Sequence, residues 1–306
     1  MSWRHILFIV DSAGHVGPRM LRKLSHLARG LGAEVELFQP AFEWGMLNKG
    51  GLGSVASDAE THMTLEQRRR ELDSLVELLL SAGVRACGVV SSEKPGYASI
   101  VRHVLDSKPD LLIVQSTRHS AIARLVLSYT DFKLIETCPC PLLLMKTEKS
   151  YLDACIVAAV DPMHAHDKPP ALDEAIVDAA ALLARAVGGT LHVCHALTPW
   201  ADLWASMPVA ERTHAELCAA YRTQAQTRVN ELAPRADLRD DRIHVMWGEP
   251  TEVLSRCART LNAEMMVMGA VSRSGIDRVF IGHTAERVLD ALECDVLVIK
   301  PPGFAV

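Results

Sequence analysis

The 306-residue chain carries 32 Lys and Arg against 37 Asp and Glu, a formal net charge of −5 at pH 7. Its 49% hydrophobic and 23% charged residues are typical of a globular protein, and the acidic balance gives no electrostatic basis for binding nucleic acid. No apolar stretch approaches the roughly 20 residues of a membrane span, and the run ILFIV that ends before Asp11 is too short for a signal peptide. We therefore expect a cytoplasmic protein whose eight cysteines, which lack the spacing of a disulfide framework, are reduced.

The pattern of elements repeats with a period of about 150 residues. Short apolar runs without alternation predict strands that are buried on both faces. The first five lie near 5–10, 34–38, 84–90, 111–115 and 141–145, and their equivalents lie near 154–160, 190–196, 242–246, 264–268 and 295–299. Helical patterns lie between the strands, as at 64–83 and at 169–189, which opens on proline and closes on a glycine pair.

Alternation of strands and helices predicts an α/β fold with two tandem doubly wound domains. Each is expected to be a Rossmann-like, five-stranded parallel sheet flanked by helices. The boundaries are placed at 1–148 and 152–306, with the join inside TEKSYLD, residues 147–153.

One long connection follows the second strand of each half, at 40–63 in the first half and at 197–210 in the second. Loops of this length are usually functional or mobile. Both carry aromatic or Met side chains, which either cap a core or partner surface or form a lid over a ligand site. These side chains are Trp44, Met46, Trp200, Trp204 and Met207.

A ligand site is predicted where the strand order reverses, beyond the carboxyl ends of the first and fourth strands of a half. In the second half this position brings together Asp161 and the loop from Gly269 to Gly282. His283 and Thr284 follow at the start of the last helix, whose free N–H groups favour an anion. The equivalent first-half loop, 114–132, contains no glycine, so we expect that half to be mainly structural.

Histidines and cysteines near this position raise the question of a metal. His164, His166 and Asp167 follow one predicted strand, and HVCH at 192–195 lies on the next. Alternating strand residues point to opposite faces, which divides the second group, so we expect structural histidines, with His164, His166 and His195 as the candidates if a metal binds. We expect Cys138 and Cys140 to be buried thiols at a helix–strand junction.

The two halves resemble universal stress protein domains in tandem. The resemblance rests on Asp11 and Asp161 after the first strands, on Gly248-Glu249-Pro250, and on the loop after the fourth strand. There the nucleotide-binding branch of the family carries Gly-x2-Gly-x9-Gly-Ser/Thr, and this chain has Gly269-x2-Ser272-x9-Gly282-His283 followed by Thr284. The last 27 residues before the C-terminal tail, GIDRVFIGHTAERVLDALECDVLVIKP, are similar to tandem members of type E.

This resemblance implies a stress-response role, an internal pseudo-dimer and, in some members, a site for ATP or a related nucleotide. Ser272 and His283 depart from the pattern, and in the first half Gln115, Arg118 and Ser128 occupy all three glycine positions, so ATP is not expected there.

Three functions follow from these residues. The first is a binding and signalling protein with a small-molecule ligand, a nucleotide or a derivative of one, at Asp161, Gly269, Ser272, Gly282, His283 and Thr284. The second is a pocket for an apolar or acylated small molecule or a partner protein. The third is a slow ATP hydrolase. The chain has no Ser-His-Asp order, paired carboxylates or Walker lysine, which favours a binding protein over an enzyme, and a homodimer is a further form left open.

Overall fold

A computed structural model describes residues 2–11, 14, 16–40, 65–92, 96–116, 127–163, 171–198, 214–269 and 283–301. Strands and helices alternate through both halves, as the apolar runs predict. The elements of the first half are β1 (His5–Ile9), α1 (Pro18–Leu31), β2 (Glu34–Pro40), α2 (Leu65–Ser81), β3 (Ala86–Ser91), α3 (Tyr97–Ser107), β4 (Leu111–Gln115), α4 (Tyr129–Thr137) and β5 (Leu142–Met145).

The second half repeats this order and adds two short 3-10 helices before its third strand. Its elements are β6 (Cys155–Ala159), α5 (Leu172–Val187), β7 (Thr190–Leu197), α7 (His214–Asn230), η3 (Ala233–Ala236), η4 (Asp240–Arg242), β8 (Ile243–Trp247), α8 (Pro250–Thr260), β9 (Met265–Gly269), α9 (His283–Ala291) and β10 (Asp295–Ile299).

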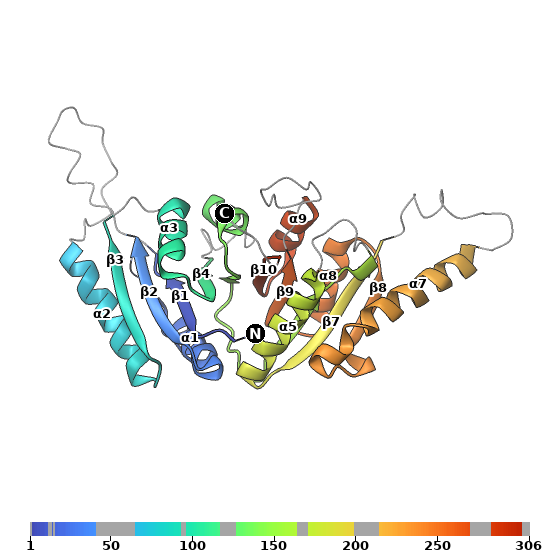
Figure 1. Ribbon diagram of the computed structural model, residues 1–306, viewed down its shortest axis with the longest axis horizontal. Helices are drawn as coiled ribbons and strands as arrows, with labels where there is room; N and C mark the ends of the chain where they lie inside the picture. Colours follow the sequence, from blue (N-terminus) through green and yellow to red (C-terminus); the bar gives the residue numbers. More distant parts are fainter. Residues whose placement is uncertain are drawn as a thin grey trace, which may run out of the picture.

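The described strands form one ten-stranded sheet in the order β3-β2-β1-β4-β5-β10-β9-β6-β7-β8. All neighbours within a half are parallel, which confirms the predicted five-stranded doubly wound sheet in each half. The halves meet where β5 pairs antiparallel with β10, with Leu143 opposite Leu297. Figure 1 shows the sheet across the width of the molecule, with the blue-to-green first half on the left and the yellow-to-red end on the right.

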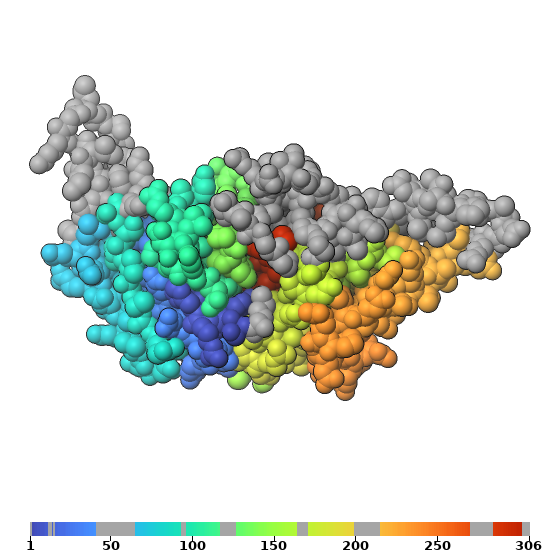
Figure 2. Space-filling view, in the orientation of Figure 1, coloured from blue at the N-terminus to red at the C-terminus, as the bar shows by residue number. Residues whose placement is uncertain are grey.

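Helices cover both faces of the sheet, and each face has an apolar core that continues from one half into the other. Helices α1, α2, α5 and α7 pack on one face, and α3, α4, α8 and α9 pack on the other. Successive strand residues serve opposite cores, as Phe8 and Leu7 do. The halves lie against each other without a break in the space-filling view (Figure 2).

The two outermost strands differ from the prediction of burial on both faces. Cys87 and Gly88 of β3 are exposed, and β8 is half-buried at four of its five residues. The prediction is wrong for these strands because an edge strand has a neighbouring strand on one side only, which leaves more of it uncovered even though α2 packs on β3 and α7 packs on β8.

Local signals explain where the main helices end. Gly32 and Gly188, with φ of 63° and 67°, close α1 and α5 in the left-handed conformation that glycine adopts readily. Gly248, with φ of 136°, forms the turn after β8, and Pro250 is the first residue of α8. No helix in the described part of the chain combines the length and hydropathy that a bilayer crossing requires.

Two buried lysines hold the halves together in a reciprocal way. Lys146, directly after β5, donates from Nζ to the carbonyl oxygens of Leu289 (2.8 Å) and Leu292 (2.5 Å) at the end of α9. Lys300, directly after β10, donates to the carbonyl oxygen of Ile135 in α4. Each lysine therefore satisfies the last carbonyls of a helix in the other half, where a cation also suits the helix dipole.

Candidate functional site

Asp161 lies just beyond the carboxyl end of β6, where the strand order of the second half reverses. β6 lies between β7 and β9, and the helices that follow β6 and β9 cover opposite faces of the sheet. Open α/β sheets bind ligands at this position. Ala158 is paired with Val267, so continuing the register brings Gly269, the last residue of β9, level with Val160. The predicted neighbourhood of Asp161 and Gly269 thus follows from strand pairing.

The Asp161 carboxylate is held at the edge of the core with its side chain 48% exposed. Its Oδ1 lies 3.8 Å from Nδ1 of His195, a buried residue of β7. The same Nδ1 is 3.0 Å from the carbonyl oxygen of Val160, and because a carbonyl can only accept, Nδ1 carries the proton. The predicted proximity of Asp161 and His195 is therefore confirmed, with the imidazole oriented by the backbone.

Two further residues near Asp161 were not predicted as part of the site. The N–H of Asp161 donates to Oδ1 of Asp173, 3.0 Å away in the first turn of α5. Tyr221 of α7 is buried beside Trp247, and burial, with a smaller effect of the Asp161 charge, raises the pKa of its phenol. In the sequence, Asp173 is only one of the early acids of a helix, and Tyr221 is one of many helical residues, so neither carries a local signal of its proximity.

Gly269 has a packing role. A Cβ at this position would lie 2.8 Å from Cδ2 of Leu172, a buried residue at the start of α5. The glycine therefore lets α5 approach the end of β9 closely. Asp161 and the start of α9 are therefore the features of this region that favour a ligand, more than this glycine.

The starts of the last helices in the two halves differ in where the first-turn acid lies and how it caps the helix. In α4, Ser128 Oγ accepts from the N–H of Asp131 (3.1 Å), and Asp131 Oδ2 accepts from the N–H of Ser128 (2.8 Å). Asp131 is only 4% exposed, so the first half fills its own helix start with a buried carboxylate. Cys140 and Cys294 are equivalent, and the same offset of 154 residues places Ala285 at the position of Asp131. The start of α9 therefore lacks this reciprocal cap, and its first-turn acid is Glu286, one residue later.

The remaining predicted residues have different outcomes. His283 is the first residue of α9, and Thr284 follows it with an exposed side chain. Ser272 and Gly282 lie outside the described residues, as do His164 and His166. Within the described ranges no three His, Cys, Asp or Glu side chains are grouped to hold a metal ion.

The predicted division of HVCH between two faces is confirmed. His195 lies next to Asp161. His192 instead stacks on His244 of β8, with 3.0 Å between Nδ1 of His192 and Nε2 of His244. Burial lowers the pKa of both stacked imidazoles, which favours their neutral forms. Cys138 and Cys140 are buried at the junction of α4 and β5, as expected.

Comparison with known proteins supports the tandem organisation. The sequence profile of the universal stress protein family matches residues 2–146 and again 156–300. Universal stress protein E of Escherichia coli strain K12 is 27% identical over 309 aligned residues, which cover 99% of this chain and 95% of that protein. The corresponding protein of Photorhabdus laumondii is 25% identical over 99% of this chain and 96% of its own.

Solved structures share the fold. A functionally unknown protein from Pseudomonas aeruginosa PAO1 superposes with a TM-score of 0.74 at 23% identity, covering 99% of this chain and 94% of that chain. A universal stress protein from Archaeoglobus fulgidus superposes with a TM-score of 0.61 at 16% identity, covering 96% and 98%. With a family match in each half and tandem relatives over nearly its whole length, the chain belongs to the universal stress protein family.

Proposed function

We propose that the chain is a tandem stress-response protein whose second half, 152–306, binds a nucleotide or a nucleotide-derived anion. The first half, 1–148, serves as its structural partner in an internal pseudo-dimer. The ligand lies between Asp161 and the start of α9. Asp161, Gly269, Ser272, Gly282, His283 and Thr284 are the proposed binding residues.

The observation that carries this proposal is the difference between the two helix starts. A helix N-terminus attracts an anion through its free N–H groups and its dipole. The buried Asp131 carboxylate already occupies that role in α4, and it would repel a phosphate. Ala285 at the equivalent position of α9 leaves the N–H groups of that turn without this acid. Asp161 is half exposed at the adjacent strand end, and its carboxylate can accept hydrogen bonds from a ribose or base, which supports the proposal.

The test transfers the cap of α4 to α9. In the variant Gly282→Ser with Ala285→Asp, the Ser-x-x-Asp arrangement of Ser128 and Asp131 is rebuilt at the candidate site. Calorimetric titration with ATP, ADP and AMP should show binding to the unaltered protein and at least about tenfold weaker binding to this variant, equal to about 1.4 kcal/mol. Equal affinities, or no heat with any of the three nucleotides, would contradict the proposal.

A matched control separates a local effect from a change in net charge. Ser74 is exposed on α2, which packs on the edge strand β3 of the other half, so Ser74→Asp adds an acid far along the sheet from α9. It should leave nucleotide affinity unchanged. Mass spectrometry of small molecules released by denaturing the purified protein adds an independent readout. A purine nucleotide supports the proposal, whereas an acylated or lipid-like species favours the apolar-pocket alternative.

A further inference from the structure

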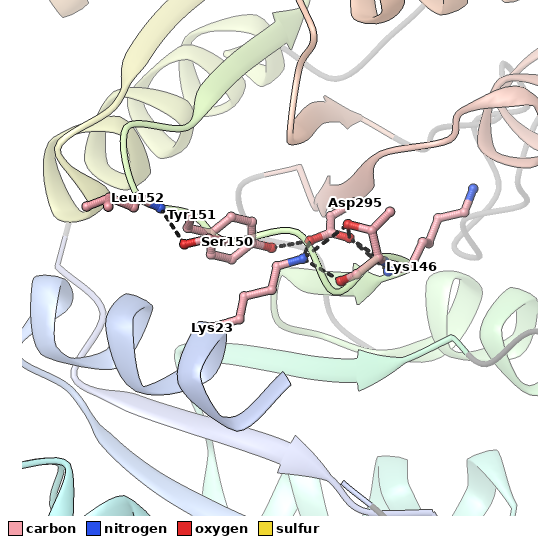
Figure 3. Close-up of polar contacts among 7 residues, drawn as sticks. Lys23, Lys146, Ser150, Tyr151, Leu152 and Asp295 are labelled. Carbon is pink, nitrogen blue, oxygen red and sulfur yellow. Dashed lines mark hydrogen bonds and ion pairs between the residues drawn. The ribbon is translucent and has the colours of Figure 1, made fainter. Parts of the chain in front are cut away.

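A buried ion pair joins the two halves through three separate segments. Asp295, the first residue of β10, is 0% exposed and pairs with Nζ of Lys23, which comes from α1 of the first half. The hydroxyl of Tyr151, in the join between the halves, donates to Asp295 Oδ2 at 2.5 Å, and the N–H groups of Lys146 and Thr147 donate to Oδ1 at 2.9 and 3.0 Å. Figure 3 shows the side chains of Lys23 and Tyr151 pointing toward the Asp295 carboxylate.

Lys23 is enclosed as completely as its partner. Its side chain is 1% exposed, its Nζ donates to the carbonyl oxygen of Thr147 at 2.7 Å, and it lies 4.4 Å from the centre of the Tyr151 ring. Burial lowers the pKa of Lys23, and the Asp295 carboxylate opposes this shift. Burying a charge is costly unless it is paired and hydrogen-bonded, and each member of this pair depends on the other half of the chain.

The repeat carries each charge only once. The offset that aligns Cys140 with Cys294 places Pro141 at the position of Asp295. Lys23 lies nine residues before the left-handed Gly32, and nine residues before the equivalent Gly188 lies Ala179. The first half therefore supplies a lysine and no acid, and the second half supplies an acid and no lysine.

The backbone edges of β5 and β10 do not by themselves determine which of the two strands pairs with which. Leu143 and Leu297 are equivalent in the repeat and lie opposite each other in the antiparallel pair. The same geometry is thus available to β5 against β5, or β10 against β10, of two chains. In the first alternative, each Lys23 would be buried against Pro141. In the second, each Asp295 would be buried against Ala179. Both alternatives leave two unpaired charges in a core.

Helix packing adds a second, steric difference. At the crossing of α1 and α5, a Cβ on Gly30 would lie 1.8 Å from the carbonyl oxygen of Ala186. Ala186 is the counterpart of Gly30, since each lies two residues before its helix-ending glycine. A crossing of two α5 helices with this geometry would place an alanine Cβ where only hydrogen fits. This packing excludes the pairing of two second halves.

We propose that Lys23, Asp295 and Gly30 make the central edge selective, so that the β5 edge accepts only a β10 edge. The fitting partner for each half is the opposite half, and pairing between two like halves is rejected by buried charge and by backbone contact. This selection prevents two or more polypeptides from associating through pairs of first halves or pairs of second halves. It does not depend on any ligand.

The test uses the full chain with a cysteine reporter. With Leu143→Cys, two reporter thiols meet only when β5 pairs with β5 of another chain. The neutral variant Lys23→Met with Asp295→Asn should, after refolding from denaturant at rising protein concentration, give at least a tenfold increase in 143–143 cross-linked peptide. A short bifunctional thiol reagent captures the pair, and mass spectrometry distinguishes this peptide from those of the eight native cysteines.

Controls make each outcome decisive. Removing the exposed ion pair, with Arg235→Met and Asp178→Asn, should leave the yield at the level of the unaltered chain. If the neutral variant does not fold, Ala186→Gly with a Leu297→Cys reporter tests the steric term, and we expect more 297–297 cross-linking. The proposal is overturned if neither reporter gains cross-links over its unaltered background, or if the unaltered chain already forms like pairs to the same extent.

Discussion

Replacing Lys146 with methionine should destabilise the protein from the centre of the sheet. Methionine keeps the unbranched stem but removes the Nζ donor. The carbonyl oxygens of Leu289 and Leu292 then lose the hydrogen bonds that they accept from Lys146 at a buried position. A hydrogen bond to a charged group contributes about 1.5–3 kcal/mol. Burial lowers the pKa of Lys146, so part of this gain is offset by desolvation, and for two bonds we expect a net loss of about 2–4 kcal/mol.

Thermal unfolding at pH 7, followed by circular dichroism, measures this loss. For a domain of this size each kcal/mol shifts Tm by roughly 2–4 °C, so a loss of about 2–4 kcal/mol lowers Tm by about 4–16 °C. Lys149→Met, an equal substitution at an exposed position three residues further on, should leave Tm unchanged. A decrease of less than about 1 °C for Lys146→Met would refute the reasoning, because it would mean that the reciprocal lysine adds nothing to the junction.

Two other predictions concern the same junction. Burial lowers the pKa of Lys300 to about 8, so between about pH 8 and the ordinary value of 10.5 the unfolded chain binds the proton that the native protein has released. The stability of the unaltered protein relative to Lys300→Met should therefore rise by up to about 1.4 kcal/mol per pH unit in that window; urea titrations that give a constant difference would contradict the assigned burial. Gly30→Ala, whose Cβ would meet a backbone oxygen, should cost more than about 3 kcal/mol, whereas Gly83→Ala, with φ of 78° and no atom within 4 Å, should cost only about 1–2 kcal/mol from strain. Equal Tm decreases for the two glycine variants would argue against the close helix crossing.

Much of the fold was predictable because its signals are local. Continuous apolar runs mark strands that are covered on both faces, and the glycines after α1 and α5 mark helix ends. The same logic failed at β3 and β8, where the runs look alike but the neighbours on one side are missing. At the candidate site, the strand-end position identified Asp161 and Gly269, but the contacts of Asp173 and Tyr221 with that site depend on how α5 and α7 pack.

The sequence by itself determined that this chain is two copies of one α/β unit, because periodicity and turn residues act over a few residues at a time. Only the tertiary structure decided how the copies meet. Lys23 and Asp295 lie 272 positions apart and look like ordinary charged residues in the sequence. Their burial against each other, and the passage of Ala186 over Gly30, exist only once the two sheets share an edge. Charge burial and close packing are properties of the assembled core, so no local pattern announces them.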